Sequence, residues 1–150
     1  RGKGLKGEEL STRAYEDVLN RLYDVEKQNE IEMKVTCAPH YYRIVKERGD
    51  TPKSAGCLAG KSFMFISHRG IAQPCGYLEL HSGDVRKNGV KKVWEESPVF
   101  GRLRDPASYK GKCGRCRYLA ICGGCRARAY EMHGDFLHEE PYCSFDGTTG

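Results

Sequence analysis

Hydrophobic and polar residues alternate in two different ways near the start of the chain. After Ser11, a typical N-cap residue, hydrophobic residues recur at helical spacing and predict an amphipathic helix over residues 12–29. The hydrophobic period then falls to two residues, which predicts a strand over residues 31–36. Cys37 would lie at the end of this strand and face the buried side, and Pro39 would end the pairing. A helix that leads into a strand is typical of an α/β repeat.

The middle of the chain contains a predicted β-hairpin. Residues 41–60 are mainly polar and contain several glycines, so we interpret them as a connector that leads to Cys57. Residues 62–66 and 71–73 have the composition of strands, and Gly70 lies at the turn position that needs a positive φ. Because Cys57 precedes the hairpin and Cys75 follows it, we expect both thiols at the same end of it.

The second half of the chain predicts short helices. Hydrophobic residues at 90–94 and 99–103 indicate two of them, separated near Pro98. Residues 126–133 contain good helix formers and are followed by Gly134, a typical residue just after a helix end. Cys125 directly precedes this helix, so we expect the helix N-terminus and nearby arginines to lower the pKa of its thiol.

Composition limits the kind of protein. With 150 residues, 39% hydrophobic and 30% charged, the chain fits one small domain whose modest core needs metals or disulfides to stabilise it. No hydrophobic run approaches the ~18 residues of a membrane span, and no secretory leader opens the chain, so we expect a cytoplasmic protein. The stretch from Arg1 is typical of a loop already in progress, which predicts a C-terminal fragment of a longer protein.

Eight cysteines carry the clearest chemical signal. Four of them form the dense motif Cys113-Gly-Arg-Cys116-x5-Cys122-Gly-Gly-Cys125, in which paired thiols converge on a soft metal or an iron–sulfur cluster. Two [4Fe-4S] clusters would use all eight thiolates. A zinc site is an alternative, although its two Cys-x-x-Cys pairs normally lie further apart. A disulfide-stabilised exported domain is another, although closely spaced cytosolic cysteines more often bind metal.

Basic residues flank the dense motif, where they would offset the charge of about −2 on a cubane bound by four thiolates. They are Lys110, Lys112, Arg115, Arg117, Arg126 and Arg128. The net charge of +5 also permits a solvated surface or a zinc-stabilised nucleic-acid-binding module. Few aromatic residues lie between the basic stretches, which argues against nucleic acid. The five histidines are interpreted as surface or turn residues, and Asp84 and the Glu139-Glu140 pair as solvated charges. The histidines are His40, His68, His81, His133 and His138.

The combined spacing resembles the SPASM domain, the auxiliary-cluster domain of radical S-adenosylmethionine (SAM) enzymes. The resemblance covers residues 37–143 and departs from the common pattern in one step, with two residues rather than three between Cys122 and Cys125. It implies a small α+β, cysteine-rich domain at residues 37–150, with a β-hairpin and short helices around two [4Fe-4S] clusters. Residues 1–36 would then be the last α/β unit of a partial (β/α)6 barrel.

The resemblance also implies how the ligands divide between the clusters. The first [4Fe-4S] cluster would be bound by Cys37, Cys57, Cys75 and Cys125. The second would be bound by Cys113, Cys116, Cys122 and Cys143.

The segments Thr36-Cys-Ala-Pro-His-Tyr-Tyr-Arg43 and Cys122-Gly-Gly-Cys-Arg-Ala-Arg-Ala-Tyr130 are similar to the tetrapyrrole-modifying branch of these enzymes. This implies an electron-relay and substrate-side domain of a radical SAM oxidoreductase in haem or haem d synthesis. A peptide-modifying maturase is the alternative. The implied partners are the enzyme's own N-terminal barrel, an electron donor or acceptor protein, and a tetrapyrrole or peptide substrate.

The cluster that cleaves SAM is not expected on these residues. This sequence contains no Cys-x3-Cys-x2-Cys motif. SAM and a third [4Fe-4S] cluster would therefore belong to the missing N-terminal barrel, and the fragment alone should be inactive.

Overall fold

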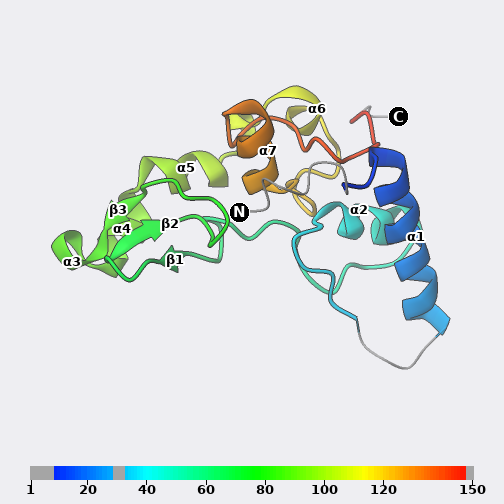
Figure 1. Cartoon of the computed structure of the whole chain (residues 1–150), viewed down its shortest axis with the longest axis horizontal. Coiled ribbons are helices and arrows are strands. Elements are labelled where there is room, and N and C mark those ends of the chain that lie inside the picture. Colours follow the sequence, from blue (N-terminus) through cyan, green and yellow to red (C-terminus); the bar gives the residue numbers. More distant parts are fainter. Residues whose placement is uncertain (1–8, 29–32, 148–150) are drawn as a thin grey trace.

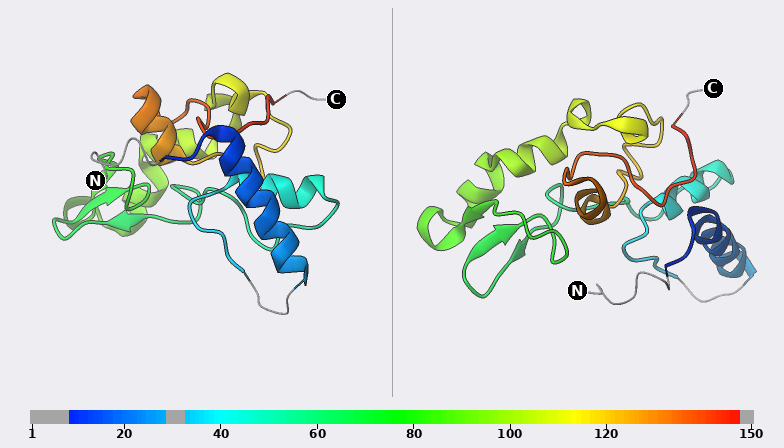
Figure 2. Two further views of the ribbon diagram at one scale, coloured as in Figure 1. Left: turned by 45° about the vertical axis from the view of Figure 1, so that its right-hand side comes forward. Right: turned by 45° about the horizontal axis from the view of Figure 1, so that its top comes forward.

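Two separate hydrophobic cores organise the molecule. The computed structural model describes residues 9–28 and 33–147. Helices α1 and α2 pack together at one end, a small sheet with α3 and α4 forms the other end, and α5, α6 and α7 lie between them (Figures 1 and 2). The predicted α+β class is confirmed for these residues. None of the helices in the described ranges is long and apolar enough to cross a membrane.

Helix α1, Thr12–Gln28, confirms the first predicted helix. The Ser11 hydroxyl accepts the Ala14 N–H at 3.2 Å, as expected of an N-cap residue. The predicted strand is wrong where it can be compared, because residues 33–36 are not in a strand, while residues 31 and 32 lie outside the described ranges. No described strand lies beside residues 33–36 to pair with them. Cys37 is exposed, contrary to expectation, with a left-handed φ of 60°.

Helix α2, His40–Glu47, lies in the stretch that we interpreted as a connector. Its buried positions Tyr41, Ile44 and Val45 follow helical spacing and pack against Leu19 and Tyr23 of α1. The interpretation was wrong because charged residues alternate with these positions and hide the short hydrophobic stripe. The α1–α2 core crosses residue 36, and the domain boundary placed there stays a prediction.

The predicted hairpin is confirmed and gains a third strand. Strands β1, Phe65–Ile66, β2, Ile71–Gln73, and β3, Gly83–Asp84, form an antiparallel sheet in that order. Phe65 pairs with Gln73 and Ile71 pairs with Asp84. Gly70 has the expected positive φ of 76° at the turn.

Short helices cover the second core. The two predicted helices are confirmed as α4, Val90–Glu96, and α5, Pro98–Arg104, while α3, Val85–Asn88, was not predicted. A 3-10 helix, η1, spans Pro106–Ser108, and α6 spans Gly111–Gly114. The core that they share with the sheet contains Ala72, Leu78, Val93, Phe100, Leu103, Tyr109, Cys113, Phe136 and Leu137.

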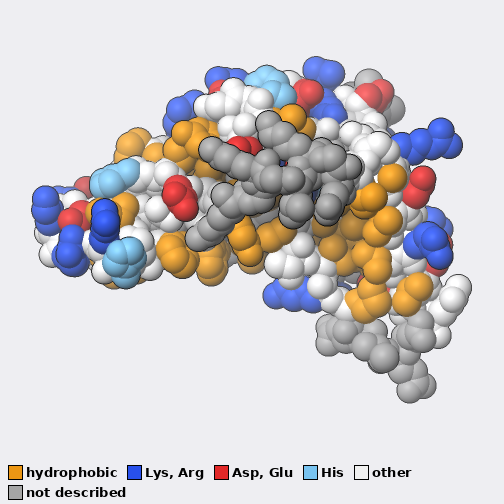
Figure 3. Space-filling model, viewed as in Figure 1, with side chains coloured by type: hydrophobic (Ala, Val, Ile, Leu, Met, Phe, Trp, Pro, Cys, Tyr) orange, Lys and Arg blue, Asp and Glu red, His pale blue; other side chains and the backbone are white. Residues whose placement is uncertain are grey.

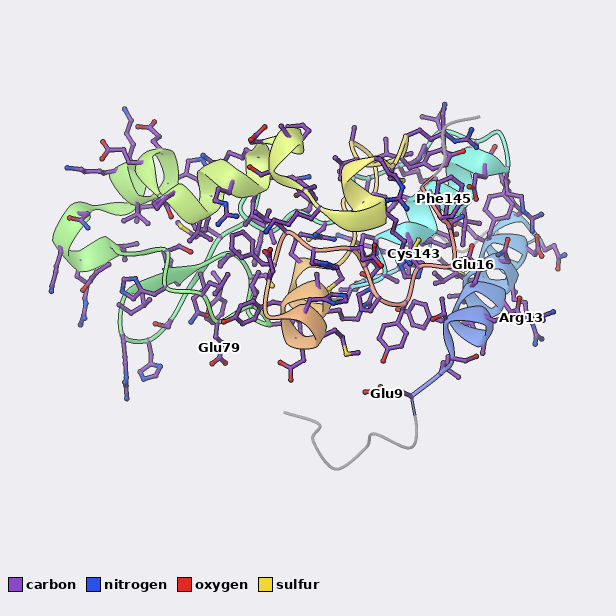
Figure 4. The ribbon with its side chains drawn as sticks, turned by 90° about the horizontal axis from the view of Figure 1, so that it is seen from above. Glu9, Arg13, Glu16, Glu79, Cys143 and Phe145 are labelled. Atoms are coloured by element: carbon purple, nitrogen blue, oxygen red, sulfur yellow. The ribbon has the colours of Figure 1, made fainter. Side chains whose placement is uncertain are left out.

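Helix α7, Arg126–His133, ends at Gly134 with a left-handed φ of 69°, as predicted. The chain then returns past the dense cysteine motif toward α1, where Tyr142 donates a hydrogen bond to Glu9 at 2.7 Å. Figure 4 shows Cys143 and Phe145 of this tail beside α2, at the same end of the molecule as Glu16 of α1. The tail thus joins the α1–α2 end to the centre of the molecule.

Candidate iron–sulfur site

Four thiols line one pocket between the dense motif and the tail. They are Cys113, Cys116, Cys122 and Cys143, the set that the family resemblance implied for the second cluster. Cys113 comes from α6, Cys116 and Cys122 from the turns that follow it, and Cys143 from the tail. We call these four residues the second quartet. Arg43, Lys112 and Phe145 complete much of the lining.

Backbone N–H groups point at the sulfurs of the second quartet. Tyr118 N–H lies 3.4 Å from the Cys116 Sγ and Gly124 N–H lies 3.4 Å from the Cys122 Sγ. Glu140 N–H donates to the Cys113 Sγ at 3.3 Å. Such donors stabilise negative charge on sulfur and help to set the potential of an iron–sulfur cluster.

Each of the other four cysteines takes part in a charge effect of one thiol on the pKa of another. Burial raises the pKa of the Cys75 thiol, and the charges of Cys57 and Cys37 raise it further. Cys57 likewise raises the pKa of Cys125. We call Cys37, Cys57, Cys75 and Cys125 the first quartet. The charge effect of Cys57 on Cys75 is consistent with the hairpin expectation, and their shared ligation stays a prediction.

One short backbone pairing joins the two quartets. Gly56 N–H donates to the Ile121 carbonyl at 2.8 Å, and Cys57 N–H donates to the Cys122 carbonyl at 2.9 Å. A cysteine of the first quartet is therefore held directly against a cysteine of the second. Their relative position depends on how closely these two segments approach.

Burial raises the thiol pKa values in both quartets. Cys116, Cys122 and Cys143 are all affected mainly by desolvation. The expectation for Cys125 was wrong, because burial raises its pKa to about 11 and the opposing effect of Arg128 is smaller. A metal bound at these thiols would therefore have to supply the free energy that deprotonates them.

Three cations lie close to the cysteines. Arg126 is 1% exposed, and its Nη2 atom lies 3.7 Å from the Cys113 Sγ. Arg43 lines the second-quartet pocket, pairs with Glu16 and Glu47, and stacks on Phe145. Lys61 is near enough to Cys57 and Cys122 to be affected by both thiols. Of these, the sequence analysis identified only Arg126.

Two other predicted basic residues also act on the thiols, since the charge of Lys112 opposes the rise in the Cys143 pKa and that of Arg128 opposes the rise in the Cys125 pKa. Lys110 pairs with Asp135 at 2.5 Å, and Lys112 donates to the Cys143 carbonyl at 2.6 Å. Figure 3 shows a second group of Lys and Arg side chains at the sheet end of the molecule, where Arg86 and Lys87 of α3 are exposed. The net positive charge is therefore divided between the cluster site and a solvated surface.

The acidic residues are less solvated than the sequence indicated. Glu140 is 1% exposed, and its interpretation as a solvated charge was wrong because Arg128 pairs with it, at 2.8 Å between Nε and Oε1. Glu139 accepts the Lys112 N–H at 2.7 Å. Asp84 caps α3 by accepting the Arg86 N–H at 2.9 Å. The signal available in the sequence was the position of Glu140, three residues before Cys143.

His40 also differs from the surface interpretation. It is 0% exposed, it lies 5.0 Å from the Tyr15 ring, and neither ring nitrogen has a hydrogen-bond partner within residues 9–28 and 33–147. His138 is half-buried, whereas His68, His81 and His133 are exposed as expected. Burial lowers the pKa of His40 from 6.5 to about 4, so the ring is neutral at pH 7.

The buried neutral ring predicts a pH dependence of stability. A lowered pKa in the folded state gives stability that is complete above the unfolded pKa of 6.5 and is lost as the pH falls toward about 4. Between pH 7.5 and 5.5, His40 should lower the free energy of unfolding by about 1 kcal/mol. Urea unfolding of wild type and His40→Phe at both pH values measures this contribution.

The control for this prediction is His68→Gln, which changes an exposed histidine. It should keep the wild-type difference between the two pH values, whereas His40→Phe should lose it. Equal pH dependence in His40→Phe and wild type would show that His40 is not buried in the neutral form.

No group of three or more His, Cys, Asp or Glu side chains in the described ranges converges on the position of a single metal ion. The thiols of a cubane instead bind iron atoms at separate corners of the cluster. The chemical character of the site fits such a cluster: four cysteines line one pocket, with N–H donors aimed at sulfur and cations nearby.

Comparison with known proteins places this site in a family. Residues 57–126 match the SPASM family model, described as an iron–sulfur cluster-binding domain. The chain is 46% identical, over 97% of its length, to an AdoMet-dependent heme synthase of Nitratidesulfovibrio vulgaris and covers 43% of that protein. It is 43% identical, over 96% of its length, to an AdoMet-dependent heme synthase of Methanosarcina barkeri and covers 45% of it.

A third relative matches less of the chain. A PqqA peptide cyclase of Bradyrhizobium diazoefficiens is 31% identical over 71% of this chain and 28% of its own length. The chain thus spans less than half the length of each of these three relatives. The resemblance noted in the sequence is confirmed, because residues 57–126 match the SPASM family of iron–sulfur cluster-binding domains.

Proposed function

We propose that this chain binds two [4Fe-4S] clusters and is the electron-relay and substrate-side domain of a radical SAM oxidoreductase that acts in haem synthesis. The second quartet would hold one cluster and the first quartet the other. The single observation that supports this most strongly is the pocket lined by all four thiols of the second quartet. When bound, the clusters would supply one-electron transfer.

The residues around the thiols are suited to holding such clusters. Gly123 and Gly124 have φ values of 70° and 57°, which lets the chain turn tightly between Cys122 and Cys125. Arg43, Lys61 and Arg126 place positive charge beside the sulfurs. The family description as an iron–sulfur domain favours iron over zinc.

The choice of substrate class follows from the relatives. Those named AdoMet-dependent heme synthases match nearly the whole chain at 43–46% identity, whereas the peptide cyclase matches 71% of it at 31%. We therefore propose a tetrapyrrole substrate for the complete enzyme. SAM cleavage would take place on a barrel that precedes these residues, and an electron carrier protein would exchange electrons with the clusters.

The proposal predicts the iron content. After anaerobic reconstitution the chain should contain about eight iron atoms and about eight acid-labile sulfides. Cys143→Ala removes a thiol from the second quartet only, and should lower both numbers toward about four while the first cluster is retained. Iron and sulfide analysis, with the visible spectrum, measures both.

A matched control exists in the same tail. Ser144→Ala changes the exposed neighbour of Cys143 and should leave the iron content unchanged. Wild-type chain that binds zinc without sulfide, or that contains no more than about four irons, would contradict the two-cluster assignment.

A further inference from the structure

Glu140 contacts one cysteine of each quartet. Its backbone N–H donates to the Cys113 Sγ at 3.3 Å, and its Oε2 atom accepts the Cys125 N–H at 2.5 Å. Cys113 belongs to the second quartet and Cys125 to the first. A single residue is therefore hydrogen-bonded to one cysteine of each quartet.

The charge of Glu140 is buried and paired. The side chain is 1% exposed, and Arg128 binds it through two hydrogen bonds, at 2.8 Å to Oε1 and 3.0 Å to Oε2. Tyr142 N–H donates to Oε1 at 3.2 Å, so that with the Cys125 N–H the carboxylate accepts four hydrogen bonds. Arg128 also reaches the Tyr15 hydroxyl of α1 at 3.2 Å. These contacts hold the carboxylate in one orientation.

Close packing keeps Glu140 in this position. A Cβ atom on Gly124 would lie 2.9 Å from the Glu140 Cβ and 3.3 Å from the Cys113 Sγ. Gly124, which lies between Cys122 and Cys125, therefore leaves just enough space for Glu140 beside the sulfur. Because the Glu140 carboxylate is held in one place, its charge acts on the neighbouring cysteines from a fixed position.

We propose that Glu140 is a positioning residue that holds Arg128 beside the first cluster and balances its charge, so that neither charge alone shifts the reduction potential of the first cluster relative to the second. This inference rests on the proposed two-cluster function. A negative charge near a cluster disfavours the addition of an electron, and burial strengthens that effect because the local dielectric is low. Arg128 acts in the opposite direction, so the intact pair leaves a small net effect.

We therefore expect loss of the two charges to shift the reduction potential of the first cluster in opposite directions. Glu140→Gln keeps the shape of the side chain and leaves Arg128 positive, so the first cluster should be easier to reduce. At a fixed potential the ratio of reduced to oxidised cluster should rise about tenfold, which is equivalent to about 59 mV. Arg128→Gln should shift the ratio the other way. The double variant should return close to wild type.

Redox titrations of the reconstituted full chain, followed by electron paramagnetic resonance, measure these shifts. Cys75→Ala identifies the first-cluster step, because that step should disappear in this variant. Glu139→Gln is the matched control, because it removes a neighbouring carboxylate that accepts the Lys112 N–H, and it should leave the first-cluster step unchanged.

The outcomes separate this inference from the proposed function. A wild-type chain that does not bind two clusters contradicts the proposed function. If wild type binds two clusters, the role of Glu140 alone is overturned when the single variants leave the first-cluster potential unmoved or both shift it in the same direction. If one single variant loses its clusters, the other single variant decides. A shift in its expected direction supports the inference, and an unmoved first-cluster potential overturns it.

Discussion

Replacing Gly56 with alanine is expected to lower the iron content and destabilise the fold by about 3 kcal/mol. A Cβ atom at this position would lie 2.7 Å from the Cys122 carbonyl carbon and 2.8 Å from its Cα. Both are backbone atoms, which cannot move aside as a flexible side chain can. The segment that carries Cys57 must therefore move away from the segment that carries Cys122.

This movement breaks the pairing between the quartets. The hydrogen bonds from Gly56 and Cys57 to the Ile121 and Cys122 carbonyls, at 2.8 and 2.9 Å, depend on the close approach. Because Cys57 belongs to the first quartet and Cys122 to the second, both clusters should be affected. Iron and sulfide analysis after reconstitution, together with urea unfolding, measures the two effects.

Gly101→Ala provides the matched control. Nothing lies within 4 Å of a Cβ built on Gly101, which is in α5. Alanine favours a helix over glycine, so this variant should keep full iron content and gain up to about 1 kcal/mol. If Gly56→Ala also kept full iron content and wild-type stability, the close approach of the two segments would not be required for the clusters.

Elements with a clear hydrophobic period were predictable from the sequence. The spacing of Leu19 and Tyr23 predicted α1, and Gly134 predicted the end of α7. Helix α2 was missed because its hydrophobic positions are few and lie among charged residues. The prediction of a strand at residues 31–36 was wrong where it could be compared. A strand needs backbone hydrogen bonds to a neighbouring strand, and alternation of hydrophobic and polar residues does not show that such a neighbour exists.

The cysteines of the site were predictable, but their polar surroundings were not. Spacing identified the thiols, and resemblance to a family supplied their division between clusters. Arg43, His40 and Glu140 were missed or misinterpreted because sequence gives the charge of a residue but not its partner. Burial of Glu140 depends on Arg128, and burial of Arg43 depends on Glu16, which lies 27 positions away along the chain.

Replacing Arg126 with methionine is expected to destabilise the protein by about 3 kcal/mol or more. The guanidinium donates to the carbonyls of Gly124, Phe136 and His138, at 3.1, 3.1 and 2.7 Å, and it lies over the Tyr109 ring. Methionine has a similar length but no donor, so buried carbonyls lose their partners and water cannot easily replace them. Urea unfolding of the two proteins at pH 7.5 measures the difference.

The same substitution tests the link between the fold and the second cluster. Arg126 also donates to the Cys113 Sγ at 3.7 Å, so its loss removes a positive charge and a hydrogen bond from that sulfur and should make the second cluster harder to reduce. Arg126→Lys should recover the charge but not the full set of hydrogen bonds, because one ammonium group cannot reproduce the guanidinium geometry. Arg126→Lys should therefore restore the reduction potential of the second cluster more fully than the free energy of unfolding.

Arg115→Met separates these effects from a general loss of charge. Arg115 is exposed and lies next to Cys116, so its replacement should change stability by less than about 0.5 kcal/mol. If Arg126→Met unfolded at the same urea concentration as Arg115→Met, the buried guanidinium would not hold the turn at Gly124 to the tail. A large loss confined to Arg126→Met would instead show that one side chain both closes the fold around the second quartet and supplies positive charge to its sulfur.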